Sequence, residues 1–379
     1  MIAYLVVYCF GLLASLISMA LARKDVLLDL TVVFVFVIFA GLRYQTGNDW
    51  WVYEQLFNTY SVGSDDAGLI RQNFEPLFLF LNYITSIVPE VQFMFFLISL
   101  FNGFALWRFF RKFEASFSAV FFIYFGWLYL ALQMAALRYS LAISLTLLAL
   151  IFFWDKRRVS STICYIAAVG FHVFALALVP FFLVNRYVIG LKTVIAALAV
   201  SAVIAVVDVK AVLEPFAFVP FISKIYFYFY ETSAYKLSIG SLLYILINLI
   251  FLTYLMRQRE DSYALALARW GTLYLLIFQI SFWYLPVFWN RIQMIVIIFQ
   301  CLYISQVLLW KGFVHSLLLF LISAVLTLAV LVRTLLDPAM ISYVPYQGYI
   351  TKKVFSKDEG DGESRFFKAL DIHMERNIK

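Results

Sequence analysis

Long apolar stretches recur along nearly the whole of this 379-residue chain, and they restrict its fold more than any other feature. A helix of about 20 apolar residues crosses the hydrocarbon core of a bilayer. Inside lipid every backbone N–H and C=O must be satisfied, and a helix does this within its own segment. The strands of a transmembrane barrel would instead be short and alternate in polarity. The sequence therefore predicts an all-α, polytopic integral membrane protein.

The composition excludes a soluble domain. Hydrophobic residues make up 64% of the chain and charged residues only 13%, which leaves too little polar surface for a soluble protein of this size. The net charge of +7 comes from basic residues between the apolar stretches, so it predicts membrane orientation and not nucleic-acid binding. The three cysteines lie inside apolar segments without metal-ligand spacing, so we expect no disulfide, no metal and no cofactor.

We expect about 10 to 12 transmembrane helices. Two stretches are ambiguous: residues 76–88 are short for a span and can be re-entrant, whereas residues 159–184 can be one span or a broken hairpin. The N-terminal span is interpreted as retained, because no basic region or cleavage site accompanies it. The clear spans are 2–22, 26–41, 91–108, 117–133, 135–154, 188–207, 241–256, 262–285, 292–310 and 313–332.

Basic residues between the spans predict the orientation of the chain, because short cytoplasmic loops are enriched in Lys and Arg. If both ambiguous stretches return to the side that they entered from, all the basic loops are cytoplasmic. Both termini and the loops 42–75 and 208–240 then face outward. The cytoplasmic loops would contain Arg23 and Lys24, Arg108, Arg111 and Lys112, Lys156 to Arg158, Arg257 and Arg259, and Lys311.

Residues 1–333 are predicted to form a single transmembrane domain, and residues 334–379 a polar C-terminal tail. Within the domain, residues 223–231 (SKIYFYFYE) are typical of an amphipathic segment lying on the membrane. In the tail, residues 357–363 (KDEGDGE) predict a flexible link. The helix expected after it carries apolar residues that can rest on a bilayer surface: Phe366, Phe367, Leu370 and Met374.

A polar cluster interrupts the apolar pattern at residues 41–57 (GLRYQTGNDWWVYEQLF). Gly47 can supply a turn, Asn48 an N-cap, and Asp49 a favourable charge in the first turn of a helix. An interfacial helix with aromatic residues at headgroup level explains the cluster. Binding of an anionic or sugar ligand by Arg43 and its polar neighbours explains the cluster as well. The expected apolar face of this helix consists of Tyr53, Leu56, Phe57 and Tyr60.

Three titratable residues lie within or beside apolar spans. Arg138 costs a few kcal/mol near the start of its span unless it snorkels to the interface or faces a polar cavity. His172 can be a hydrogen-bonded packing residue or a catalytic group. Arg291, considered alone, is typical of a residue that anchors a helix at the membrane–water interface.

Considered together, the charged residues predict a site for a phosphorylated substrate. Arg43, Arg138 and Arg291 can all reach the outward side of the bilayer in the predicted topology. Arginine matches phosphate oxygens because several N–H donors meet several acceptors at a fixed geometry. The set fits a lipid-linked pyrophosphate as the leaving group.

A general base is expected near the same level of the membrane. Asp49, Glu75 and His172 are the candidates, in that order of preference, because a carboxylate or imidazole can deprotonate a sugar hydroxyl. Asp49 comes first because a helix N-terminus and an adjacent arginine can fix it in place. Orienting Arg43 is an alternative role for Asp49.

Six pieces of sequence carry a resemblance to a known family. They are GLRYQTGNDWWVYEQLF at 41–57, FEPLFLFL at 74–81, LRYSLAISL at 137–145, AAVGFHVFALALVPF at 167–181, WNRI at 289–292 and YVPYQ at 343–347. In this order they resemble the EpsG-like family of bacterial membrane proteins, which includes Wzy-type polysaccharide and O-antigen polymerases. The chain departs from the family pattern at Pro76, and at Tyr139, where a Gln is frequent, and neither change removes a charge.

The resemblance implies a multi-pass enzyme of the bacterial inner membrane whose active site faces the periplasm or the cell exterior. It would move a growing glycan from undecaprenyl pyrophosphate to the terminal sugar of a lipid-linked repeat unit. The implied partners are that lipid-linked oligosaccharide, the bilayer, a chain-length regulator and a flippase. A flippase or exporter of lipid-linked glycans, a glycan ligase and a non-catalytic assembly subunit remain alternatives.

The resemblance also implies roles for single residues. It places Asp49, Glu75 and His172 among the catalytic residues. The implied residues for binding pyrophosphate and substrate are Arg43, Arg138, Arg291, Tyr53, Asn290 and Tyr346.

Overall fold

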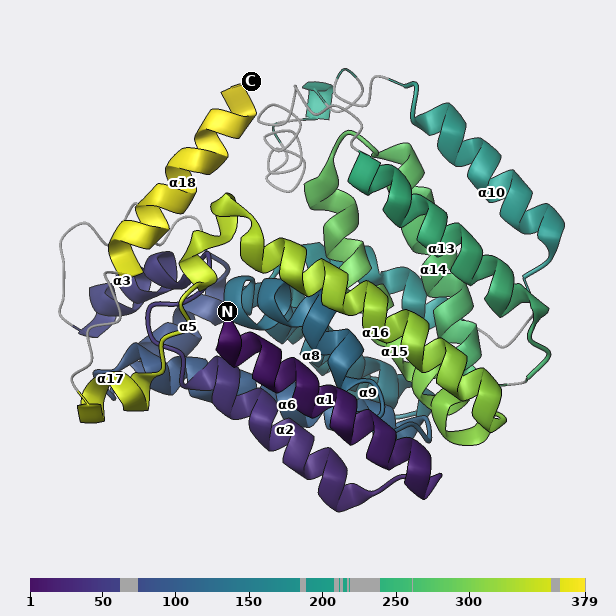
Figure 1. Ribbon diagram of the computed structural model, residues 1–379. Helices are drawn as coiled ribbons and strands as arrows, with labels where there is room; N and C mark the ends of the chain where they lie inside the picture. The colour runs from purple at the N-terminus through teal and green to yellow at the C-terminus, as the bar shows by residue number, and fades with distance from the viewer. Residues whose placement is uncertain are drawn as a thin grey trace. The chain divides into compact units, whose positions relative to one another are not determined.

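The computed structural model of this chain is built from helices (Figure 1). It forms two compact units, each with its own hydrophobic core. Unit 1 comprises Met1–Leu176 and Ile304–Arg376, and unit 2 is built around Ala177–Tyr303. The structure describes residues 1–61, 74–184, 189–207, 211, 214–216, 218, 239–260, 262–355 and 362–378.

Unit 1 contains the candidate site, and its helices come from both ends of the chain. The N-terminal set is α1 (Ile2–Leu21), α2 (Val26–Gly41), α3 (Trp50–Ser61), α5 (Pro76–Thr85), α6 (Val91–Lys112), α7 (Phe121–Tyr124), the π-helix η1 (Phe125–Ala135), α8 (Leu137–Trp154) and α9 (Arg158–Phe171). The C-terminal set is α16 (Phe313–Leu336), the 3₁₀-helix η4 (Pro338–Tyr343), α17 (Tyr349–Phe355) and α18 (Gly362–Ile378).

Unit 2 contains the helices between these two sets. They are most of the 3₁₀-helix η2 (Val173–Leu183), α10 (Leu191–Ile204), the short η3 (Glu214–Phe216), α13 (Ile239–Arg257), α14 (Tyr263–Ser281) and most of α15 (Pro286–Trp310). The predicted amphipathic segment 223–231 and most of the predicted loop 208–240 lie outside the described residues.

Among the described residues, seven helices are long and apolar enough to cross a membrane: α1, α6, α8, α13, α14, α15 and α16. This confirms the predicted all-α polytopic class. The predicted spans 26–41, 117–133 and 188–207 correspond to shorter apolar helices, namely α2, α7 with η1, and α10.

The two ambiguous stretches take irregular forms. Residues 76–88 give the ten-residue α5, which is too short for a hydrocarbon core about 30 Å thick. In the stretch 159–184, α9 ends at Phe171 and η2 begins at Val173. The Tyr165 hydroxyl donates to the Ala175 carbonyl at 2.7 Å, whereas a straight helix would separate these residues by about 15 Å. The helical path of the chain is therefore interrupted at His172, where its direction changes.

An ion pair lies at each end of unit 1. At one end Lys112 pairs with Asp155, which brings together the loops after α6 and α8 that were both predicted to be cytoplasmic. The opposite end holds the start of α6, where Glu90 pairs with Lys353 at 3.0 Å. The Tyr4 hydroxyl donates to the Tyr343 carbonyl at 2.7 Å, so the N-terminus lies at this second end, beside η4.

Candidate functional site

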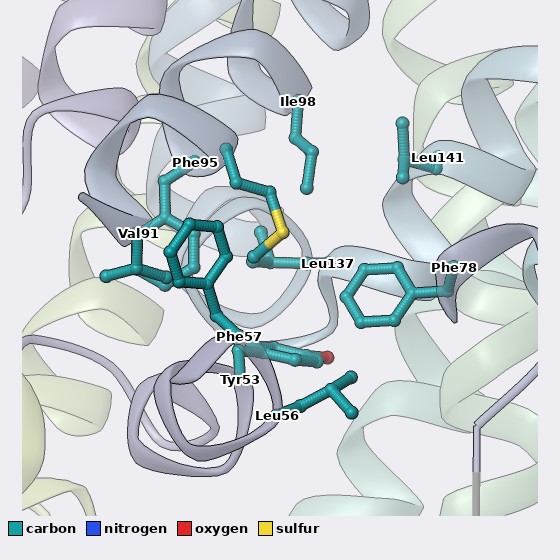
Figure 2. Close-up of a cluster of buried hydrophobic side chains, with 10 residues drawn as sticks. Tyr53, Leu56, Phe57, Phe78, Val91, Phe95, Ile98, Leu137 and Leu141 are labelled. Carbon is teal, nitrogen blue, oxygen red and sulfur yellow. The ribbon is translucent and has the colours of Figure 1, made fainter. Parts of the chain in front are cut away.

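Helix α3 turns its apolar face into the core of unit 1. Tyr53, Leu56 and Phe57 are at most 3% exposed. Figure 2 shows them projecting toward side chains of α5, α6 and α8. The amphipathic pattern is thus confirmed, but protein and not the headgroup region covers this face. The partners in this core are Phe78, Val91, Met94, Phe95, Ile98, Leu137 and Leu141.

Arg138 and Glu75 form an ion pair beside this core. Nη1 of Arg138 donates to Oε2 of Glu75 at 2.7 Å. The Arg138 side chain is 25% exposed and that of Glu75 only 9%. The Phe74 ring centroid lies 4.6 Å from the guanidinium carbon, and Tyr53 is a further hydrogen-bond partner of Arg138. Arg138 is therefore held by three groups of the protein and retains an accessible side.

The first turns of three helices meet at this ion pair. Arg138 is the second residue of α8, Glu75 is the N-cap of α5, and Tyr53 lies one turn into α3. The N-terminus of a helix carries about +0.5 of an elementary charge on its unsatisfied N–H groups. Three such ends and the arginine offer donors that suit phosphate oxygens, while Glu75 balances the charge of the arginine in this structure.

The local sequence explains where these helices begin. Pro76 follows Glu75 and occupies the first helical position of α5, where its fixed φ fits and its missing N–H costs nothing. The π-helix η1 ends at Ala135, and Ala136 has non-helical angles (φ −79°, ψ 61°) before α8 starts. This break places Arg138 at the end of the span and not in its middle.

Arg43 is completely buried, unlike Arg138. Its Nη1 donates to the carbonyls of Ala40 at 2.7 Å and Gln133 at 3.2 Å, which lie at the C-terminal ends of α2 and η1. Such ends carry partial negative charge and stabilise a cation. Its Nε and Nη2 atoms have no hydrogen-bond partner among the described residues. Burial lowers the pKa of the Arg43 guanidinium, and the nearby tyrosines oppose this shift.

Tyr346 lies on the Arg43 side of the site. Its ring stacks on Phe39 with centroids 4.3 Å apart, and its hydroxyl donates to the Phe39 carbonyl at 2.8 Å. The Tyr44 N–H donates to the Gln347 carbonyl at 2.8 Å, so the segment after η4 pairs with the loop after α2. Burial raises the pKa of the Tyr346 hydroxyl. Tyr346 therefore fixes the end of α2 beside Arg43.

His172 occupies the break between α9 and η2. Its Nδ1 accepts the N–H of Phe174 at 3.1 Å, and its ring meets the Tyr139 ring edge-on with centroids 5.1 Å apart. Because Nδ1 accepts, the neutral imidazole carries its proton on Nε2. In this arrangement His172 supports the start of η2. It also contacts Tyr139, the residue that follows Arg138 in the sequence.

Asp49, and not Asn48, stands at the N-cap position of α3. The main-chain carbonyl of Asp49 accepts the Tyr53 N–H at 3.2 Å, so the predicted Asn48 cap is wrong. The Asn48 side chain instead accepts the Ser342 hydroxyl at 2.6 Å, because η4 packs against this loop. Burial and then the Asp49 charge raise the pKa of Tyr343, so Asp49 lies near the end of η4.

Helix α18 packs on the outer side of α3 (Figure 1). Phe366 stacks on Trp51, with ring centroids 5.5 Å apart and planes 19° apart. Arg365 Nη1 donates to the Pro345 carbonyl at 2.9 Å. Trp51 therefore covers part of the Phe366 ring, and the predicted bilayer contact of this face stays a prediction. Three other predicted residues of that face are at least 41% exposed: Phe367, Leu370 and Met374. The predicted link 357–363 lies outside the described residues except for its last two positions, which begin α18.

Arg291 and Asn290 lie in unit 2, in the first two turns of α15. Asn290 is exposed and Arg291 is partly buried. Of the predicted site residues of unit 1, the structure brings Tyr53, Glu75 and Arg138 together, with Arg43 against the same core. The participation of Arg291 and Asn290 stays a prediction.

A buried polar network that the sequence pattern did not predict begins at Gln133. Asn102 Nδ2 donates to Gln133 Oε1 and to Ser140 Oγ, both at 2.9 Å, and the Ser144 hydroxyl donates to Asn102 Oδ1 at 2.7 Å. The Gln133 carbonyl is also an acceptor for Arg43. Amide side chains inside apolar spans were the available signal, because an unpartnered amide there is costly.

Two further buried charges are structural. In unit 1, Asp29 accepts the Ser116 hydroxyl at 2.6 Å and the Ser118 N–H at 2.9 Å. In unit 2, Arg269 Nε donates to the Leu255 carbonyl at 2.9 Å, at the C-terminal end of α13. Both charges are satisfied by groups of the protein, so neither is assigned to the candidate site.

Unit 2 contains an apolar cleft of about 310 Å³. Its lining has no charged side chain, so it does not suit a pyrophosphate. It is lined by Pro180, Phe181, Leu183, Val184, Trp270, Leu273, Tyr274 and Ile277. Throughout the part of the chain that the structure describes, no three His, Cys, Asp or Glu side chains form a group that could hold a metal ion.

Comparison with known proteins identifies one family. The EpsG family model matches residues 26–348, a range that includes every predicted site residue. No curated protein and no solved structure gives a significant match.

Proposed function

We propose, on the premise that this chain belongs to the EpsG family, that it is a multi-pass membrane polysaccharide polymerase. In the proposed reaction a growing glycan leaves undecaprenyl pyrophosphate and joins the terminal sugar of a lipid-linked repeat unit. The product is an exopolysaccharide or an O-antigen. The site faces the periplasm or the cell exterior of a bacterium, on the inner membrane.

The observation that carries this proposal is the position of Arg138. It lies where the first turns of α3, α5 and α8 meet, next to Tyr53 and Glu75. Preorganised donors and helix N-termini stabilise charge that develops on a leaving group. A pyrophosphate that leaves an anomeric carbon develops such charge, so this arrangement fits the donor half of the reaction.

The acceptor half needs a group that takes the proton of a sugar hydroxyl. Glu75 and Asp49 are the carboxylates at this end of unit 1 that the sequence predicted for this role. Glu75 contacts the arginine directly, whereas Asp49 lies toward η4. Contact with the arginine favours Glu75, because the attacking hydroxyl must lie close to the bond that breaks.

Arg43 supports the site from within the protein. Its buried guanidinium ties the ends of α2 and η1 together, and η1 leads directly into the turn that presents Arg138. In this proposal Arg43 positions Arg138.

Reconstitution tests the proposal. Purified protein in nanodiscs receives synthetic undecaprenyl-pyrophosphate oligosaccharide repeats, and glycan length is read on a gel. The polymerase predicts a ladder with released undecaprenyl pyrophosphate, which Arg138→Gln abolishes and the exposed control Arg333→Gln retains. Movement of the lipid-linked glycan between leaflets without a ladder would instead show a transporter. Transfer to a different acceptor without a ladder would show a ligase.

A further inference from the structure

We propose that Arg138 exchanges partners during the reaction: it leaves Glu75 for the pyrophosphate of the donor, and the freed Glu75 carboxylate deprotonates the acceptor hydroxyl. This inference rests on the proposed function and names the base of that site. The exchange also sets the order of events, because Arg138 releases the base Glu75 only after the donor has bound.

The difference in exposure between the two partners favours the exchange. The Arg138 side chain is 25% exposed and the Glu75 side chain 9%. An anion arriving from solvent therefore meets the cation first. The guanidinium has five N–H donors, and a pyrophosphate offers several acceptors in place of one carboxylate oxygen.

Arg138 keeps its position when it gives up Glu75. Phe74 lies under the guanidinium at 4.6 Å, and Tyr53 remains a hydrogen-bond partner. Neither contact involves the carboxylate. The arginine is therefore held in place for an incoming anion at little conformational cost.

Glu75 is free to turn away. At an N-cap position, a carboxylate ordinarily accepts a backbone N–H from the first turn of its own helix. The Glu75 side chain makes no such bond to α5 and is directed to Arg138 instead. Once the arginine has a new partner, rotation about the side-chain bonds of Glu75 breaks no capping contact.

The chemistry balances without another reactant. The acceptor hydroxyl gives its proton to a Glu75 oxygen, and its oxygen forms the new bond to the anomeric carbon. The bond from that carbon to the pyrophosphate oxygen breaks, and undecaprenyl pyrophosphate leaves with the electron pair. Once the guanidinium has moved to the pyrophosphate, the Glu75 oxygen that it occupied can accept the hydroxyl proton, so donor binding makes the base available. Proton release from Glu75 to solvent restores the resting ion pair.

Binding of farnesyl diphosphate to the purified full chain in detergent tests the exchange, with farnesol as the probe that lacks phosphate. Glu75→Gln should bind farnesyl diphosphate about fivefold more tightly than the unaltered chain, because the probe no longer competes with a carboxylate. Arg138→Gln should lose the binding. Glu90→Gln, which removes an exposed carboxylate at the same end of unit 1, should leave the affinity unchanged. Equal affinities of Glu75→Gln and the unaltered chain would overturn the exchange.

Polymer formation supplies the second readout. Glu75→Ala should fail to polymerise and regain measurable activity with added formate, which can stand in for the carboxylate. The double variant Glu75→Arg with Arg138→Glu should recover the melting temperature lost in either single variant and still make no polymer. Polymerisation by this swapped pair at the unaltered rate would show a structural ion pair only, and would overturn the exchange.

The two proposals fail in different ways. If the unaltered chain polymerises but Glu75→Gln polymerises equally well, the exchange is wrong and the polymerase stands. If the unaltered chain makes no polymer and binds no farnesyl diphosphate, the proposed function itself is wrong.

Discussion

The guanidinium carbon of Arg43 lies 4.4 Å from the centroid of the Phe95 ring, inside the core of unit 1. The negative face of an aromatic ring stabilises a desolvated cation. The same arginine donates to carbonyls of two helices that end 94 residues apart, at Gly41 and Ala135. One buried cation therefore joins α2, η1 and α6 without an ion pair to a carboxylate of the described residues.

Arg43→Lys should destabilise the protein although it keeps the charge. Both carbonyls accept from the one Nη1 atom, and a lysine ammonium lacks the delocalised guanidinium that lies over the Phe95 ring. We expect a loss of about 1–3 kcal/mol of unfolding free energy, seen as a lower melting temperature in detergent. Arg333→Lys, at an exposed position on α16, is the matched control and should melt like the unaltered chain. Equal melting of both variants would contradict the role assigned to Arg43.

Gly47→Ala should damage the loop that precedes α3. Gly47 has a φ of 115°, and a Cβ at this position would lie 2.3 Å from the Met134 carbonyl oxygen. Both the backbone angle and the overlap are unfavourable, so we expect a loss of at least about 2 kcal/mol in thermal unfolding. Gly312→Ala is the control, since a Cβ there meets nothing within 4 Å. The expectation fails if Gly47→Ala and Gly312→Ala have the same melting temperature.

The packing of α18 on α3 should depend on pH through Glu54. Burial and then the charge of Glu363 raise the pKa of Glu54 above its ordinary value of 4.5. The folded state therefore binds a proton on the Glu54 carboxylate more tightly than the unfolded state does. The stability contributed by protonated Glu54 is complete below the pKa of Glu54 in the unfolded chain. It is lost as pH rises through the higher pKa of Glu54 in the folded protein.

Glu54→Gln should therefore be more stable than the unaltered chain at neutral pH, because the amide stays uncharged. The difference in melting temperature should shrink as pH falls toward the ordinary value of 4.5. Glu363→Gln should give a smaller stabilisation, since it removes only the second cause of the shift. A difference that does not change with pH would show that folding leaves the pKa of Glu54 unshifted.

His172→Asn should retain both stability and polymer formation. The Asn Oδ1 atom can replace Nδ1 as the acceptor for the Phe174 N–H. His172→Leu lacks an acceptor and should lose about 1 kcal/mol in thermal unfolding. If His172→Asn keeps its melting temperature but makes no polymer, the imidazole takes part in the chemistry and its role is more than support.

The sequence named residues that the structure brings together, but it did not reveal which partner each of them has. Tyr53, Glu75 and Arg138 were all named, and the structure brings them together. Asp49 was preferred as the base from its place at a helix start, but its proximity to Tyr343 depends on a segment almost 300 positions away. Arg43 was grouped with the other arginines because sequence does not reveal that a charge near a membrane exit is fully enclosed.

What the sequence determined by itself was the membrane class and the positions of most helices. Both follow from local properties, because the length of an apolar stretch and the pattern of its caps lie within one segment. Only the tertiary structure decided that Glu75 pairs with Arg138, that Phe366 stacks on Trp51, and that Arg43 serves two helix ends. These choices depend on contacts between residues far apart in the chain, where each side chain had several chemically acceptable partners and packing selected one.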